Sequence, residues 1–512
     1  MLTFLLLLLT TVAAVPIVLA LIRIYKSRIN LKFYERQGMK VYFNPIKGVF
    51  GLYDAKLPGN DKYSNMEYMK QISKEYKHLP GIVTNQIHNN MSAVFLHDPE
   101  YVKEFLLQEE HFDKGSMEKG WPEHDGFWSQ NGEKAFKAKA IFSDIFNYDA
   151  LSSFTPKLCE MIVQSLKEFN QQQNVDSTNF KTINLNELYA IIFERVLNLF
   201  IFGRTHMEPT ATGKSVYQTV IDNFFLVPKV RRNPIFVLFP DIAAKFRLCK
   251  EYHQAYQYNE ILKAFMEKWY KKREAEGDFS DCVFDRIILH NRRAKSEGRH
   301  EDYLSLQQVV GLINVMQITG TDTSQNTSKM VICKMANRED LKNLIGQINS
   351  EIFDDKGITN NEKLNGHETL AHWLKETLRI YHPGARVVPR IAKRDLVLKD
   401  LHIRKGDSVS ITYSGLMFNE EVFPDANTFK IDRFTKENEK SIPKYQYLPY
   451  FVGKRNCLGK HLAELMVKLT VCHFCRMYDY KTPADVEYYI ENTMITHMAN
   501  PFVDVRLKTL NR

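Results

Sequence analysis

The chain has 512 residues and a formal net charge of +9. Apolar residues make up 44% and charged residues 25%, which is typical of a folded globular protein and argues against a largely disordered chain. The basic excess favours an acidic partner or an anionic membrane surface. Nucleic-acid binding is not expected, because the sequence has no arginine-rich tract and no basic stripe with interleaved aromatic residues.

The first segment, from Met1 to Ile22, carries no charged side chain, and basic residues follow it directly, beginning with Arg23. A helix of about 20 residues crosses the apolar core of a bilayer. Because flanking positive charge stays on the cytosolic side, we predict one transmembrane signal anchor over residues 1–24, with the rest of the chain in the cytosol. A cleaved signal peptide is the alternative, although it normally places basic residues before a shorter apolar core.

Residues 25–52 are basic and then turn-rich, and they are predicted to form a linker. Most of the span from Tyr63 to Pro383 has the 3.6-residue periodicity of helices. Its apolar segment Leu226–Pro240 either rests on a membrane or packs on the body of the protein. Between Leu396 and Tyr413 the pattern alternates, which predicts a hairpin that turns at Lys405–Asp407. We therefore predict a mainly α fold with small peripheral β-sheets (α+β), in a single domain over residues 53–512.

A small and hydroxylated segment, Thr319-Gly320-Thr321-Asp322-Thr323-Ser324, interrupts an apolar helical pattern. Gly320 and Thr323 continue the helix face that begins with Leu312 and Met316, so this face changes from apolar to polar along its length. Glycine beside Thr and Ser inside a helix also predicts a local distortion. A polar helix that simply crosses the core is the alternative interpretation.

The strongest chemical signal is Leu448-Pro-Tyr-Phe-Val-Gly-Lys-Arg-Asn-Cys-Leu-Gly459, in which Cys457 lies in a predicted tight loop before the helical stretch His461–Met477. The helix amino terminus and Arg455 favour the thiolate, which is the form that binds metals. Gly453 and Gly459 let the backbone approach a flat ligand. A buried cysteine in a turn is the alternative, but the pattern G-x-R-x-C-x-G is rare by chance.

The other six cysteines are scattered, which indicates reduced thiols in a cytosol-facing protein instead of a disulfide framework. Cys472 and Cys475 form a C-x-x-C pair within an apolar helical stretch. We interpret the pair as part of a buried helix face.

The Cys457 loop resembles the haem-binding loop of the cytochrome P450 family, F-x-x-G-x-R-x-C-x-G, with Tyr450 in place of the phenylalanine. The resemblance implies the cytochrome P450 fold and haem b (iron protoporphyrin IX) as cofactor, with Cys457 as the axial ligand of the iron. It also implies that Tyr450, Gly453, Arg455 and Gly459 line the haem.

Further segments resemble the family's motifs in the same order. Gly320, Asp322 and Thr323 match the oxygen-activation motif [AG]-G-x-[DE]-T-[TS], whose first position is Thr319 here. This resemblance implies a catalytic role in which Asp322 and Thr323 relay protons.

Glu376-Thr-Leu-Arg379 matches E-x-x-R, and Phe429-Lys-Ile-Asp-Arg433-Phe resembles F-x-P-E-R-F. By resemblance, Glu376, Arg379 and Arg433 form a structural ion-pair triad. The pair Glu376 and Arg379 on a helix face is the plain alternative, since such spacing is common.

Two haem propionates require cations, and the resemblance implies Arg455 and Arg390 for this role. The family's W-x-x-x-R aligns with Ala135 to Lys139, which makes Lys139 a third candidate. Lys139 is equally compatible with a solvated basic face, and lysine is a weaker bidentate partner than arginine.

The resemblance implies a monooxygenase that activates O2 to hydroxylate or epoxidise a lipophilic small molecule: a lipid, sterol or xenobiotic. Electrons would come from a separate NADPH-dependent flavoprotein reductase, with cytochrome b5 as a further donor, at a basic face that includes Lys454 and Lys460. The expected location is the endoplasmic reticulum membrane, single-pass, with the catalytic domain facing the cytosol. Two alternatives stay open: a reductase-independent isomerase or lyase acting on peroxides, and a non-catalytic haem-binding sensor or carrier.

Overall fold

The computed structural model describes residues 2–43, 70–71, 74–86, 91–114, 131–143, 146, 151–233, 235–236, 239–384, 389–492 and 495–508. The α-helices are α1 (Leu2–Glu35), α4 (Pro99–Leu107), α5 (Gly132–Ser143), α7 (Thr155–Gln173), α8 (Leu185–Phe202), α9 (Val216–Arg232), α11 (Pro240–Lys245), α12 (Lys250–Glu276), α13 (Val283–Ser296), α14 (Leu306–Met335), α15 (Glu339–Ile352), α16 (Asn361–Gly366), α17 (Glu368–Ile380), α18 (Tyr413–Met417), α19 (Lys436–Glu439) and α20 (Lys460–Met477). The short 3-10 helices are η2 (Glu109–His111), η4 (His300–Asp302), η5 (Ile431–Phe434) and η6 (Gly453–Arg455). The strands are β1 (Lys40–Tyr42), β2 (Gly81–Gln86), β3 (Met91–Leu96), β4 (Phe112–Lys114), β5 (Lys181–Asn184), β6 (Arg390–Ala392), β7 (Leu396–Leu398), β8 (Leu401–Ile403), β9 (Ser408–Ile411), β10 (Tyr478–Lys481), β11 (Tyr489–Asn492), β12 (Thr496–Ala499) and β13 (Phe502–Leu507).

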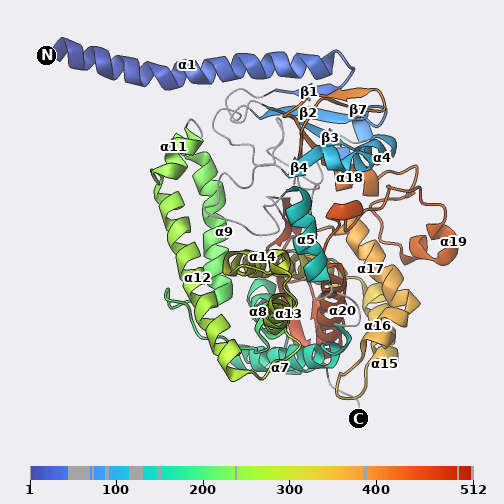
Figure 1. The fold of residues 1–512 in the computed structure, drawn as a ribbon. Helices are drawn as coiled ribbons and strands as arrows, with labels where there is room; N and C mark the ends of the chain where they lie inside the picture. The colour runs from blue at the N-terminus through green and yellow to red at the C-terminus, as the bar shows by residue number, and fades with distance from the viewer. Residues whose placement is uncertain are drawn as a thin grey trace.

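Helices dominate the molecule, and the sheets lie at its margins (Figure 1). The prediction of a mainly helical fold with small peripheral sheets is therefore confirmed. The largest sheet has six strands in the order β1-β2-β3-β9-β6-β4, and β10, β13 and β5 form a second sheet of three. Two further pairs, β7 with β8 and β11 with β12, complete the described strands.

The predicted hairpin between Leu396 and Tyr413 is wrong in its pairing. β8 pairs with β7, whereas β9 runs parallel to β3 and antiparallel to β6. All four residues of β9 are buried, because the strand lies inside the six-stranded sheet. Alternation in the sequence identified the strands, but it contains no information about which distant strand is the partner.

Helix α14 crosses the middle of the helical body and packs against α8, α9, α12 and α20 (Figure 1). It begins with a capping box, in which the Ser305 side chain accepts from the backbone of Gln308 and the Gln308 side chain accepts in return. Most of its residues are buried, including polar ones such as Asn314 and Gln317. α14 is one continuous α-helix from Leu306 to Met335, with no break at Gly320.

Helix α1 continues through residues 25–35, which were predicted to be part of a turn-rich linker; residues 44–52 of that linker lie outside the described residues. Its last turns join the body, because Leu31 and Tyr34 are buried. The Tyr34 hydroxyl donates to Asp407, which also accepts from the backbone of Ser92. Within the part of the chain that the structure describes, no helix has the length and apolar character needed to cross a membrane, so the predicted transmembrane span is not seen. The side chains of residues 1–16 lie outside that part.

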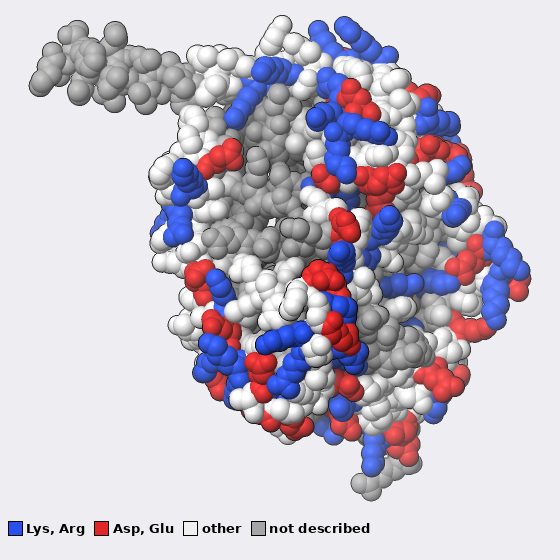
Figure 2. All heavy atoms as spheres, in the orientation of Figure 1, with Lys and Arg blue, Asp and Glu red and all other residues white. Residues whose placement is uncertain are grey.

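Acidic and basic side chains are interspersed over most of the face shown in Figure 2. Cys472 and Cys475 are buried on α20, as predicted.

Candidate functional site: the Cys457 loop and its supports

The loop that carries Cys457 runs from Leu448 into the start of α20. The Cys457 backbone N–H donates to the carbonyl of Tyr450 at 2.9 Å, which closes the loop. Phe451 adopts φ +58°, a left-handed conformation that costs a non-glycine residue about 1–3 kcal/mol and persists only where the surroundings enforce it. Such stored strain is typical of functional sites.

The side chain of Cys457 is accessible, unlike the other six cysteines, which are all buried. Many protein atoms nevertheless lie near the sulfur. This burial is the largest influence on the Cys457 thiol and raises its pKa. Both observations hold together if the sulfur faces space enclosed by the fold instead of bulk solvent. A hydrogen bond from the Gly459 backbone and the charges of Lys139 and Lys460 act in the opposite direction and favour the thiolate.

Gly453 adopts a φ of +76°, a conformation that favours glycine. A Cβ atom there would lie 2.7 Å from the Glu109 carboxylate, which is the movable end of its side chain and would have to shift. Gly459 differs, since its φ is negative and a Cβ atom would meet no protein atom within 4 Å. The open space beside Gly459 next to the accessible sulfur leaves room for a flat ligand.

A group of cations surrounds Glu109, on η2. Arg390, Arg455 and Lys139 each lower the Glu109 pKa, whereas burial raises it. Arg390 is buried, and burial together with the neighbouring charge of Arg455 lowers the Arg390 pKa to about 10. Three cations around one carboxylate favour a further anionic ligand, such as a pair of propionates.

Lys139 does not point away into solvent. Its Nζ donates to the backbone carbonyls of Lys454 at 2.9 Å and Asn456 at 3.0 Å, and also to the Asn456 side chain. Arg455 lies over the ring of Phe136, 4.5 Å from its centroid. Lys139 therefore connects helix α5 to the Cys457 loop by hydrogen bonds, and Phe136 of the same helix packs against Arg455.

The structure brings Glu376, Arg379 and Arg433 together. Glu376 and Arg379, both on α17, form two hydrogen bonds of 2.7 and 2.8 Å and are fully buried. Arg379 also donates to the carbonyls of Met417 and Ala426. Arg433 Nε lies 3.4 Å from a Glu376 oxygen, which is an ion-pair distance without hydrogen-bond geometry. The arrangement ties α17 to the segments that precede the Cys457 loop.

Gly320, Asp322 and Thr323 lie on the central helix α14. A Cβ atom at Gly320 would touch Leu197 of α8 at 3.4 Å. The Thr323 hydroxyl donates to the Thr319 carbonyl at 2.6 Å, and Asp322 Oδ1 accepts from Asn326 at 3.2 Å. Asp322 and Thr323 are half-buried, so both side chains reach partly accessible space within the helical body.

Sequence reasoning missed His382, Tyr413 and Glu109. The buried His382 ring bonds to the Pro449 carbonyl at 2.8 Å and to Gly384, and it lies 4.0 Å from the Tyr413 ring. Burial lowers the His382 pKa, so the ring is neutral and Nε2–H donates to Pro449. The segment His382-Pro-Gly directly after the E-x-x-R helix was the available signal. No sequence signal pointed to Glu109, because only the fold brings it close to the Cys457 loop.

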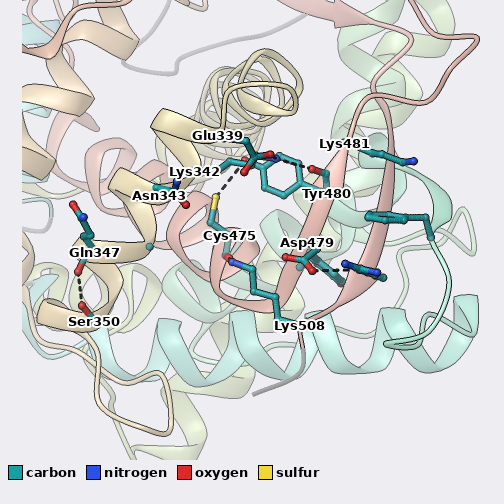
Figure 3. A pocket seen from close by; sticks show the side chains of 14 residues that line it. Glu339, Lys342, Asn343, Gln347, Ser350, Cys475, Asp479, Tyr480, Lys481 and Lys508 are labelled. Atoms are coloured by element: carbon teal, nitrogen blue, oxygen red, sulfur yellow. Dashed lines mark hydrogen bonds and ion pairs between the residues drawn. The ribbon is translucent and has the colours of Figure 1, made fainter. Parts of the chain in front are cut away.

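A cavity of about 800 Å³ lies elsewhere, between α15, the end of α20 and the sheet of β10 (Figure 3). Four of its charged side chains form two ion pairs: Arg506 bonds to Asp479, and Lys342 bonds to Glu339. Lys508 donates to the Cys475 carbonyl. This cavity contains none of the predicted site residues.

Haem fits the residues of the Cys457 loop. An accessible sulfur with an N–H donor, open space beside Gly459, and nearby arginines are the donor set that an iron porphyrin with two carboxylates requires. Tyr450 contributes its backbone carbonyl to the loop, and burial raises the pKa of its hydroxyl, which keeps the phenol neutral.

Comparisons with known proteins agree with this geometry. A family model described as Cytochrome P450 matches residues 57–503. Cytochrome P450 3A12 from Canis lupus familiaris is 23% identical over 309 residues, which is 59% of this chain and 59% of that protein. Lithocholate 6-beta-hydroxylase from Mesocricetus auratus is 26% identical over 279 residues, 54% of each chain. The matches thus span somewhat over half of these relatives' length.

Solved structures show the same fold. The chain is similar to retinoic acid-bound cyanobacterial CYP120A1, with a TM-score of 0.72 and 17% identity, over 92% of this chain and 99% of that one. It is also similar to the haem domain of a cytochrome P450DA mutant, with a TM-score of 0.71 and 15% identity, over 88% and 94% of the two chains.

Proposed function

Because this chain belongs to the cytochrome P450 family, with haem b as its cofactor, we propose that it is a haem-thiolate monooxygenase that oxidises a lipophilic small molecule with O2. The observation that carries the proposal is the accessible sulfur of Cys457, held in a loop that the Cys457 N–H closes by donating to the Tyr450 carbonyl. The bound haem would supply the oxygen chemistry, and a thiolate ligand favours cleavage of the O–O bond.

The protein's own contribution is positioning and proton control. Cys457 would ligate the iron, while Arg390 and Arg455 would bind the propionates. Gly320 lets α14 pack closely against Leu197 of α8, and Asp322 and Thr323 would deliver protons from water. Glu376, Arg379 and Arg433 would hold the fold behind the haem without touching the reacting atoms.

The substrate is proposed to be lipophilic and to arrive from a membrane. Leu226 and Val230 of α9 are buried, but large apolar side chains around the turn to α11 are exposed. They are Phe225, Ile235, Phe239, Ile242, Phe246 and Leu248. Helices α1 and α11 lie toward the same end of the molecule in Figure 1. An apolar surface beside a predicted anchor at residues 1–24 supports attachment to the endoplasmic reticulum membrane, with the catalytic domain in the cytosol.

Electrons are proposed to come from a separate NADPH-dependent flavoprotein reductase, with cytochrome b5 as a further donor. Lys454 and Lys460 are exposed beside the Cys457 loop, and Lys137 is exposed on α5. These side chains support docking of an acidic partner. Electron transfer should slow as salt is raised, and a rate that stays constant would contradict this docking.

The absorption spectrum of the reduced, carbon-monoxide-bound protein tests the proposal. Wild type should show the red-shifted band of a thiolate-ligated haem, and Cys457→Ala should lose it. Cys475→Ala is the matched control, because Cys475 is buried on the helix that follows the loop. A protein without haem, or with a band that persists in Cys457→Ala, would refute the assignment. Conversion of a hydroperoxide into its own isomer or cleavage products, without a reductase and without a second substrate, would instead identify an isomerase or lyase.

A further inference from the structure

Lys139 uses all of its hydrogen-bonding capacity on the Cys457 loop. An ammonium group has three N–H donors. The structure offers three acceptors around Nζ: the Lys454 carbonyl, the Asn456 carbonyl and the Asn456 side-chain oxygen. All three belong to residues within three positions of Cys457. Lys139 is therefore bonded to the loop through three acceptors.

Lys139 belongs to a helix that is remote in sequence from the loop, and neighbouring residues hold its position on that helix. Ser143 donates its hydroxyl to the Lys139 carbonyl at 2.8 Å, one turn further along α5. Ala135, one turn before Lys139, is buried and packs the helix against the protein. Phe136 lies beneath both Arg455 and Lys454, with cation-to-centroid distances of 4.5 and 5.6 Å. The position of Lys139 relative to the loop is thus set by packing on both sides.

The charge of Lys139 also reaches the sulfur. The Lys139 ammonium bonds to the carbonyl of Asn456, the residue directly before Cys457, at 3.0 Å, so its positive charge lies close to the sulfur. A half-buried cation next to an iron ligand stabilises the more negative, reduced state of the iron centre.

We propose that Lys139 is a positioning residue that clamps the thiolate loop to α5 and raises the reduction potential of the haem. This role deepens the proposed function and rests on it, since it requires a haem bound through Cys457. It differs from a propionate-binding role, because the partner of Lys139 is the loop itself.

The test uses the haem-loaded full chain and two measurements that need no substrate or reductase. One is the midpoint potential of the haem, and the other is the rate at which the reduced, carbon-monoxide-bound protein loses its red-shifted thiolate band. Lys139→Met removes the charge and the donors, whereas Lys139→Arg keeps both. Lys137→Met is the matched control, because Lys137 is an exposed lysine on the same helix that pairs only loosely with Glu133, at 3.7 Å.

Lys139→Met should shift the reduction equilibrium toward the oxidised form about tenfold, equal to about 59 mV for one electron. It should also accelerate loss of the thiolate band about tenfold, since hydrogen bonds from a charged donor are lost. Lys139→Arg and Lys137→Met should stay within about twofold of wild type on both measurements, because the first keeps the charge and donors and the second is exposed and screened.

Asn456→Ala removes one acceptor of the clamp while leaving Lys139 charged. It should also accelerate loss of the thiolate band, and its effect should not add to that of Lys139→Met, because both break the same contact. A propionate role predicts instead that Asn456→Ala has no effect. If Lys139→Met behaves like Lys137→Met while wild type keeps its thiolate band, the clamp is refuted and the proposed function stands. If wild type lacks the thiolate band, both the Lys139 clamp and the proposed function are refuted.

Discussion

Replacing Arg379 with methionine should destabilise the protein severely, because it leaves the Glu376 carboxylate buried without its main partner. Both side chains are 0% exposed, and the variant removes the two hydrogen bonds of 2.7 and 2.8 Å between them. The carbonyls of Met417 and Ala426 lose their donors as well. Breaking a buried pair from one side costs about 3–5 kcal/mol. That loss is a large part of the roughly 5–15 kcal/mol by which a typical domain is stable.

Thermal unfolding and haem retention together provide the assay, because a cofactor-bearing protein does not unfold in a single two-state step. Arg338→Met is the matched control. Arg338 pairs with Asp340 at 2.6 Å, but the two side chains are 44% and 61% exposed. An exposed pair contributes about 0–1 kcal/mol. If Arg379→Met unfolded at a temperature as close to wild type as Arg338→Met does, the assignment of the buried pair as a main support of the fold would be refuted.

Three further predictions concern the loop, the central helix and the pH dependence of stability. Gly453→Ala should destabilise the protein by about 1–2 kcal/mol through its positive φ, because the Glu109 carboxylate can shift to admit the methyl group. Gly298→Ala, at φ +69° with nothing within 4 Å, should show a similar cost in chemical unfolding. Asp322→Asn should reduce product formation about 100-fold without changing the haem spectrum, and an unchanged turnover number would exclude it from proton delivery. Burial and the neighbouring Arg476 lower the His473 pKa to about 3 from 6.5, so the unfolded chain takes up this proton first and stability falls as pH decreases from 6.5. At pH 5 the loss from His473 is about 2 kcal/mol, and His473→Phe should unfold with a correspondingly flatter pH dependence.

Contiguous motifs and local periodicity can be recognised from the amino-acid sequence alone. The loop around Cys457 is recognisable because its glycines, arginine and cysteine lie within a few residues of one another. Glu376 and Arg379 are recognisable because a spacing of three places two side chains on one helix face. The mainly helical fold follows from the 3.6-residue repeat of apolar residues, since a helix needs no distant partner to satisfy its backbone.

Only the tertiary structure decided which remote groups meet. β9 pairs with β3, more than 300 positions earlier, and nothing in its alternation specified that partner. Lys139 meets Asn456 across a sequence separation of 317 residues, and Glu109 meets Gly453 only because both are packed together. Hydrogen-bonding capacity and charge belong to the residue, but the acceptor that each donor finds depends on how burial brings distant segments into contact. The motif of the Cys457 loop is therefore local in the sequence, whereas the residues that support the loop were determined by the fold.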